Sequence, residues 1–246
     1  NTLPDSRLAS EILEEIGIIG LQEQGFTGSG ISVAVVDTGV DPQVLIPGSV
    51  ASIVDLTSEG LILTSEPVAP GADGTISRSG VVYGVKGLGS QSGKIRVGSW
   101  SDDQLPRTTT SSSPIRELDG IKIAVSDRYI PGQYDTVYVD TDRDDDLSDE
   151  APLEKYRGID GFAPVRVGNG AVALAVADIG DGGRRVSLFF DANGHGTSMA
   201  SILAADHPEV SPLAPDVSIL AIKAVDSAGD SNWDLISRGI EAACDE

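Results

Sequence analysis

An apolar segment that ends in a single carboxylate constrains the fold of this chain most. Residues 30–37 read GISVAVVD, a β-branched run in which apolar and polar positions do not alternate. Such a run is typical of a strand in a parallel sheet, because helices cover both faces of that sheet and bury the strand on both sides. Residues 217–225, VSILAIKAV, have the same character. Together the two runs predict an α/β fold in which helices flank a parallel sheet.

Three segments around these strands have helical spacing. The first, at 7–24, predicts one continuous helix, because apolar residues recur at Leu8, Ile12, Ile16 and Ile19 before Gly25 ends it. The second begins near His195 and has apolar residues at Met199, Ile202 and Leu203. The third runs from Trp233 to Cys244. Cys244 is the only cysteine, so an internal disulfide and a zinc cluster of thiolates are excluded. We expect Cys244 to be a small core residue.

The middle of the chain has a different pattern of apolar and polar residues. Residues 42–190 contain short alternating segments such as KIAVSD, TVYVD and RVSLFF, separated by Gly, Pro and Ser-rich stretches. This pattern is typical of antiparallel hairpins, and 106–114 is expected to be an exposed loop. We therefore divide the chain into an α/β part, 1–41 and 191–246, and a β-rich insertion, 42–190.

Charge and hydropathy exclude several kinds of partner. The chain has 38 acidic residues against 17 basic ones, a net charge of −21. Such a surface repels nucleic-acid phosphates and anionic membranes, so neither is an expected partner. No apolar run approaches the roughly 20 residues of a membrane span. The acidic excess fits adaptation to high salt, an acid-tolerant secreted surface, or ordinary solubility.

Asp37 and His195 are the candidate catalytic residues. Asp37 ends a strand of the predicted parallel sheet, where α/β proteins present reactive groups, and His195 stands between two glycines at a helix start. A carboxylate on one imidazole nitrogen would fix the tautomer and leave the other nitrogen free as a general base. The alternatives are an aspartate that only caps a turn and a histidine with a structural role.

The two motifs resemble those of a known family. ISVAVVDTGVD looks like the Asp motif of the subtilisin-like serine proteases, and DANGHGTSMASILAA looks like their His motif. The likeness covers residues 7–41 and 191–246. It implies a subtilisin-like sheet and a secreted serine endopeptidase that acts on polypeptides without a cofactor. In that enzyme Asp37 orients His195, and His195 is the base.

Ser198 lies in the string GTSMAS, which looks like the setting of a nucleophilic serine. We expect it not to be the nucleophile. Ser198 and His195 would both project from one short helical segment, with their Cβ atoms about 5–6 Å apart and no separate oxyanion donors opposite. The resemblance implies that three further parts of the enzyme come after Glu246 in the sequence. They are the strand of the specificity pocket, the oxyanion-hole asparagine and the nucleophilic serine. The fold is therefore expected to be incomplete at its C-terminal end, with the remaining part of the catalytic domain as its partner.

The resemblance also implies a branch and a substrate site. A large insertion between the Asp and His motifs looks like the pyrolysin and tripeptidyl-peptidase II branch, and residues 138–157 are similar to a segment of pyrolysin-like insertions. Gly229, Asp230 and Ser231 are implied to form an edge strand that pairs with an extended peptide. Trp233 is implied to lie near a distal subsite. Because the chain has a net charge of −21, we expect Asp230 to favour basic residues in the substrate, and a solvated loop carboxylate is the alternative.

The segment DTDRDDDLSDE at 140–150 is a candidate calcium site. Asp140, Asp142 and Asp144 alternate as oxygen ligands do in a DxDxD loop. The pattern is imperfect, because Asp145 stands where such a loop has glycine and Ala151 where it has a bidentate acid. A solvated acidic turn is the equal alternative.

Two other functional classes compete with the protease. A catalytically inactive binding module could keep the fold and act through its acidic insertion. An esterase of the α/β-hydrolase type would need a G-x-S-x-G string, which the sequence does not contain.

Overall fold

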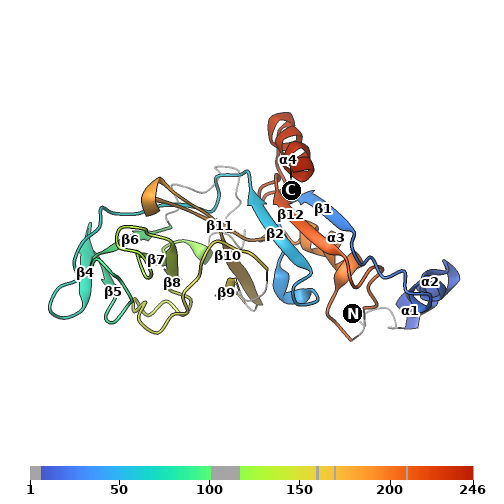
Figure 1. Cartoon of the computed structure of the whole chain (residues 1–246), viewed down its shortest axis with the longest axis horizontal. Coiled ribbons are helices and arrows are strands. Elements are labelled where there is room, and N and C mark those ends of the chain that lie inside the picture. Colours follow the sequence, from blue (N-terminus) through green and yellow to red (C-terminus); the bar gives the residue numbers. More distant parts are fainter. Residues whose placement is uncertain (1–6, 101–116, 159–160, 169, 209, 246) are drawn as a thin grey trace.

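A three-stranded parallel sheet forms the centre of the α/β part. The computed structural model describes residues 7–100, 117–158, 161–168, 170–208 and 210–245, so the predicted loop at 106–114 lies outside the described residues. The strands are β1 (Ser32–Asp37), β12 (Ser218–Lys223) and β2 (Val50–Asp55), in the order β1-β12-β2 (Figure 1). Asp37 is in register with Lys223, and Lys223 with Asp55. Three charged residues therefore meet at the carboxyl edge of the sheet.

Helices cover the two faces of this sheet, as predicted. Ala200 and Ala204 of α3 (His195–Ala204) share a core cluster with Val35. On α4 (Trp233–Asp245), a Cβ on Gly239 would stand 2.6 Å from Val36. Because consecutive side chains of a strand point to opposite faces, α3 and α4 lie on opposite faces. The buried residues of α3 are small, whereas Met199 and Ile202 are exposed, because the helix approaches the sheet closely.

Strand β1 is less buried than its sequence predicts. Among the described residues it pairs only with β12, so it lies at the edge of the sheet. Val35 is buried, whereas Ser32 and Ala34 are exposed. The expectation of burial on both faces is thus wrong for this strand in the described structure. An edge strand has a neighbour on one side only, and its side chains are correspondingly open.

The segment 42–190 forms antiparallel sheets, as predicted. One has the order β3-β11-β10-β9 and consists of β3 (Leu61–Leu63), β11 (Arg185–Phe189), β10 (Gly170–Gly180) and β9 (Phe162–Val167). Another has the order β6-β7-β8, with β6 (Ile95–Ser99), β7 (Lys122–Ser126) and β8 (Thr136–Val139). The hairpin β4 (Thr75–Arg78) and β5 (Val81–Gly84) lies at the far end of the molecule (Figure 1). Its 3-10 helices include Pro42–Val44 and Asp181–Gly183.

Strand β2 falls within 42–190 but belongs to the parallel sheet. It pairs with β12 from Ile219↔Val50 to Lys223↔Asp55. On its other side Phe189 shares a core cluster with Val50, and the Tyr156 hydroxyl donates to the Val50 carbonyl at 3.0 Å. The antiparallel strands therefore pack onto the same hydrophobic core as the parallel sheet.

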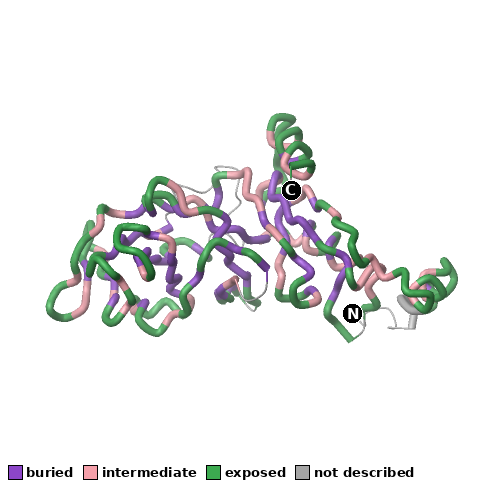
Figure 2. The backbone as a smooth tube through the Cα atoms, in the orientation of Figure 1, coloured by how far each residue is buried: buried purple, intermediate pink, exposed green. Residues whose placement is uncertain are grey.

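The N-terminal helical segment differs from the prediction. It forms two helices, α1 (Arg7–Glu15) and α2 (Ile18–Glu23), because Gly17 adopts a left-handed conformation with φ 81° between them. Ile12 and Ile16, two of the apolar residues at helical spacing, are 49% and 59% exposed. Figure 2 shows this end of the molecule largely exposed, in contrast to the sheets.

The prediction for Cys244 is also wrong, because its thiol is exposed. Helix α4 approaches the sheet at Gly239. Cys244 lies five residues further on, which at 3.6 residues per turn places it well away from that face.

No helix among the described residues is long and apolar enough to cross a bilayer.

Candidate active site

Asp37 and His195 lie in direct contact. Asp37 is the last residue of β1, and His195 is the first residue of α3. The Nδ1 atom of His195 is 2.8 Å from Oδ1 and 2.9 Å from Oδ2 of Asp37. A carboxylate in this position accepts the Nδ1 hydrogen, so the imidazole tautomer with a free Nε2 lone pair is favoured. The side chain of Asp37 is 18% exposed and that of His195 is 61% exposed, which leaves the ring open to a reacting group.

A close approach of two backbone segments makes this contact possible. A Cβ added at Gly196 would stand 2.1 Å from the Gly39 carbonyl oxygen and 3.0 Å from the Asp37 Cβ. Only glycine therefore fits at this position. The Gly196 N–H donates to the Thr38 hydroxyl at 3.0 Å, which ties the first turn of α3 to the residue after Asp37.

Asp191 organises the start of α3, and the motif analysis did not single it out. Its carboxylate accepts from the Thr38 hydroxyl at 3.0 Å, from the Gly194 N–H at 2.8 Å and from the Thr197 N–H at 2.9 Å. Its side chain is buried. These donors include free N–H groups of a helix N-terminus, which a carboxylate satisfies well. An aspartate a few residues before a glycine-flanked helix start is the signal that could have revealed it.

Ser198 is engaged with the backbone of its own helix. Its hydroxyl donates to the Gly194 carbonyl at 2.8 Å, a bond from one residue to the residue four before it. This is a common way for serine to satisfy its hydroxyl inside a helix. The contact directs the Ser198 hydroxyl to the helix backbone rather than to the His195 ring.

The predicted substrate residues lie in a turn rather than in a strand. Gly229 has φ 85°, its N–H donates to the Asp226 carbonyl at 3.0 Å, and the Asp226 N–H donates to the Asp230 carbonyl at 2.9 Å. A left-handed glycine and these local bonds close the loop on itself. The loop borders an open cavity of about 860 Å³, whose lining includes Glu59, Asp226, Asp230, Ser231 and Asp234. Trp233 follows at the start of α4 with 85% of its surface exposed.

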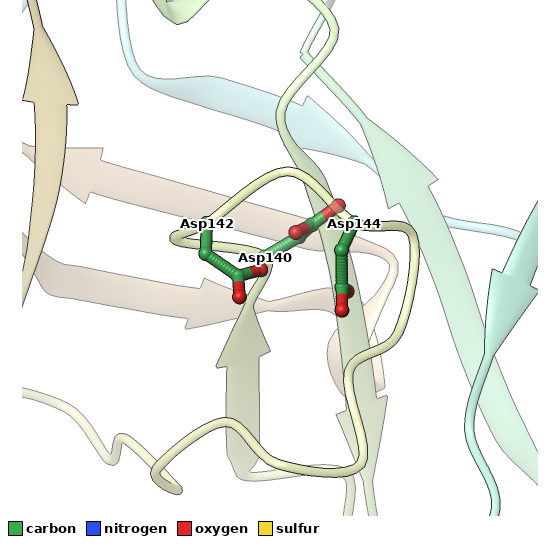
Figure 3. A group of neighbouring side chains, drawn as sticks. All are labelled: Asp140, Asp142 and Asp144. Atoms are coloured by element: carbon green, nitrogen blue, oxygen red, sulfur yellow. The ribbon is translucent and has the colours of Figure 1, made fainter.

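The three candidate calcium ligands lie together in the turn after β8. Oxygen atoms of Asp140, Asp142 and Asp144 come within 4.8 Å of one another, with Asp140 buried and the other two exposed (Figure 3). Burial raises the pKa of Asp140 above its usual range, although the Arg143 N–H donates to it. A cation here would stabilise the ionised carboxylates.

The loop geometry fits calcium in one respect and departs from it in another. Asp145, which replaces the usual loop glycine, has φ 71°, so the backbone makes the turn that glycine normally makes. Ala151 offers no bidentate carboxylate, and neighbouring Glu150 is occupied by Thr141. Three carboxylates are nevertheless a hard-oxygen donor set of the kind that calcium prefers.

A histidine held by a carboxylate at the carboxyl edge of a parallel sheet is the arrangement that serine hydrolases use for a general base and the group that orients it. The comparison with protein families agrees: the chain belongs to the subtilase family, whose model matches residues 28–246. This confirms the resemblance seen in the two motifs and supports a serine protease.

Two relatives are consistent with this assignment. Pyrolysin of Pyrococcus furiosus is 26% identical over an alignment 277 positions long, which covers 88% of this chain and 20% of pyrolysin. Thermitase of Thermoactinomyces vulgaris is 37% identical over 59 residues, or 23% of this chain and 21% of thermitase. The chain thus spans about a fifth of the length of these curated relatives. No solved structure shows significant similarity to it.

Proposed function

We propose that this chain carries the base and its orienter of a serine endopeptidase, and that the nucleophilic serine and the oxyanion hole come from a segment outside these 246 residues. The observation that carries the proposal is the contact between His195 Nδ1 and the Asp37 carboxylate. The pyrolysin branch is supported by the match to pyrolysin over most of the chain.

The chemistry follows from that contact. Nε2 of His195 takes the proton of the serine hydroxyl as its oxygen attacks the carbonyl carbon of the scissile peptide bond. Asp37 stabilises the imidazolium ion that forms. His195 then gives the proton to the leaving amine, the C–N bond breaks, and an acyl-enzyme remains. Water hydrolyses this ester in a second round in which His195 again takes and returns a proton.

Three finer assignments belong to the same proposal. Gly229, Asp230, Ser231 and Trp233 contact the polypeptide substrate, and the cavity beside the 226–231 loop supports this role for Asp230 and Ser231, which line it. Asp140, Asp142 and Asp144 hold a calcium ion that stabilises the insertion, and their clustered oxygens support it. The enzyme is secreted, and its acidic composition and its family support this assignment.

The proposal is tested in the full-length protein with a serine-directed phosphonate and a peptide substrate. The label should map outside residues 1–246, and His195→Ala should abolish turnover. Ser198→Ala should retain most of the turnover, because its hydroxyl bonds to the helix backbone. Stoichiometric labelling at Ser198 would overturn the assignment of the nucleophile. A full-length protein that neither cleaves peptides nor takes the label would favour the inactive binding module instead.

A further inference from the structure

A buried ion pair lies next to the catalytic residues. The Lys223 ammonium is 3.0 Å from the Glu59 carboxylate, and the two side chains are 0% and 2% exposed. Lys223 ends β12 beside Asp37 in the sheet register, whereas Glu59 follows β2 in the segment predicted as the insertion. Removing two charges from water is costly, and buried pairs are often no more stable than apolar replacements. The pair therefore calls for a role beyond stability.

Lys223 contacts the turn that follows Asp37. Its ammonium donates to the Thr38 carbonyl at 2.5 Å and lies 5.0 Å from the centre of the Phe190 ring. The Thr38 N–H in turn donates to the Asp37 carboxylate at 2.7 Å. The ammonium thus holds the carbonyl of Thr38, the residue whose own N–H donates to the carboxylate of the catalytic pair.

Glu59 contacts the loop that borders the cavity. Both of its oxygens accept from the Ser227 N–H at 3.0 Å, and one also accepts from the Ser227 hydroxyl at 3.0 Å. The next residue, Gly60, is pressed against β11, since a Cβ there would stand 1.8 Å from the Leu188 carbonyl oxygen. The position of Glu59 is therefore set by the antiparallel sheet.

The loop leads back to His195. The Ser227 carbonyl accepts from the Asn193 side-chain amide at 3.2 Å, and the Asn193 side-chain oxygen accepts from the His195 N–H at 3.3 Å. The contacts consequently close a ring that runs through Asp37, Thr38, Lys223, Glu59, Ser227, Asn193 and His195.

We propose that Glu59 and Lys223 are positioning residues that tie the 226–231 loop to the Asp37–His195 pair, so that substrate held by the loop meets a base in the correct place. This inference rests on the proposed protease function. It also gives the antiparallel part of the chain a role at the active site, because Glu59 lies in the connection from β2 to β3 and its neighbour Gly60 packs against β11.

The test uses the full-length protease with Glu59→Gln, Lys223→Met and the double variant. Active sites are counted by phosphonate titration, and an extended peptide is compared with a short ester that does not reach the loop. Glu59→Gln should raise KM for the extended peptide by roughly tenfold, because a charge-assisted bond to the loop is lost. In Glu59→Gln, the kinetic constants for the short ester, measured per active site, should change by less than about twofold.

The double variant separates positioning from stability. Each single variant leaves one buried charge unpaired and should lower the melting temperature, whereas the double variant removes both charges and should regain much of it. The KM defect should persist in the double variant, because the link from the loop to Thr38 is still absent. If KM recovers together with the melting temperature, the pair is only structural and the proposal fails.

A second measurement does not depend on protease activity. Hydrogen exchange should accelerate at 226–231 in Glu59→Gln while β10 and β11 stay protected. Glu66→Gln is the matched control, because Glu66 forms only an exposed pair with Arg184 at 3.5 Å. Unchanged exchange in the loop of Glu59→Gln would overturn the inference even in an inactive protein. An inactive wild type with faster loop exchange in the variant would instead contradict the proposed function alone.

Discussion

His195 Nδ1 lies 2.8 Å from Asp37 Oδ1, although 158 residues separate the two in the chain. The contact joins the end of a strand to the start of a helix, and nearly all of the antiparallel structure lies between them in sequence.

The approach of α3 to β1 should be essential for activity. Gly196→Ala places a methyl group where the Gly39 carbonyl oxygen is 2.1 Å away, so α3 must shift and carry His195 away from Asp37. Misplacement of a catalytic group by about 1 Å can cost 10²-fold, and we expect kcat/KM to fall by about that factor. Gly20→Ala is the control, because nothing lies within 4 Å of that site. Full activity in Gly196→Ala would show that the close approach is not needed.

Calcium should stabilise the folded chain if Asp140, Asp142 and Asp144 bind it. Because the ion binds only the folded state, the melting temperature should rise with its concentration, by several degrees at about 100 times the dissociation constant. The combined change Asp142→Asn and Asp144→Asn should remove the rise, and Asp149→Asn should keep it. If a monovalent salt of matched ionic strength raises the melting temperature equally, the effect is charge screening and not calcium binding.

Asp230 should influence which peptides are cleaved. In the full-length enzyme, Asp230→Ala should weaken cleavage of substrates with a nearby Lys or Arg by roughly two- to tenfold, since an exposed ion pair is worth about 1 kcal/mol or less and a partly buried one somewhat more. Uncharged substrates should be cleaved as before. Asp119→Ala, a change of the same charge at an exposed site in the insertion, is the control. The idea is abandoned if the specificity profiles of the two variants coincide.

The stability of the chain should depend on Asp55. Burial raises the pKa of this carboxyl to about 6, against hydrogen bonds from Thr57 and the charge of Lys223, which lower it. The folded state therefore holds the proton more tightly than the unfolded state, and this contribution to stability is lost as pH rises from about 4 through about 6. Asp55→Asn should match the wild type at pH 4 and exceed it by roughly 1–3 kcal/mol at pH 8.

Urea unfolding at constant ionic strength measures this difference. Asp216→Asn is the control, because Asp216 is exposed. A difference that is independent of pH would contradict the assignment to Asp55. It would point to packing rather than to proton binding.

Sequence patterns predicted secondary structure correctly where a single segment determines it. The apolar runs at 30–37 and 217–225 predicted β1 and β12, and the alternating segments predicted hairpins such as β10 with β11. The same patterns gave wrong predictions of burial, because burial is determined by neighbouring elements. They predicted that Cys244 lies in the core and that β1 is buried along its whole length, yet Cys244, Ser32 and Ala34 are exposed.

Long-range pairing was outside the reach of the sequence. A lysine in the apolar run VSILAIKAV signals a buried charge that needs a partner, but no local pattern indicates that Glu59 is that partner. Strand β2 likewise could not be assigned to the parallel sheet, because its partner β12 lies far along the chain.

The sequence by itself determined the class of fold and the family, and it indicated Asp37 and His195 as the candidate catalytic pair, because periodicity and compact motifs are properties of short segments. Only the tertiary structure decided that Asp37 and His195 touch, that Asp191 holds the start of α3, and that Glu59 and Lys223 meet beneath the loop at 226–231. Those contacts join residues from separate strands and loops. Their distances follow from sheet register and helix packing, which a linear pattern does not contain.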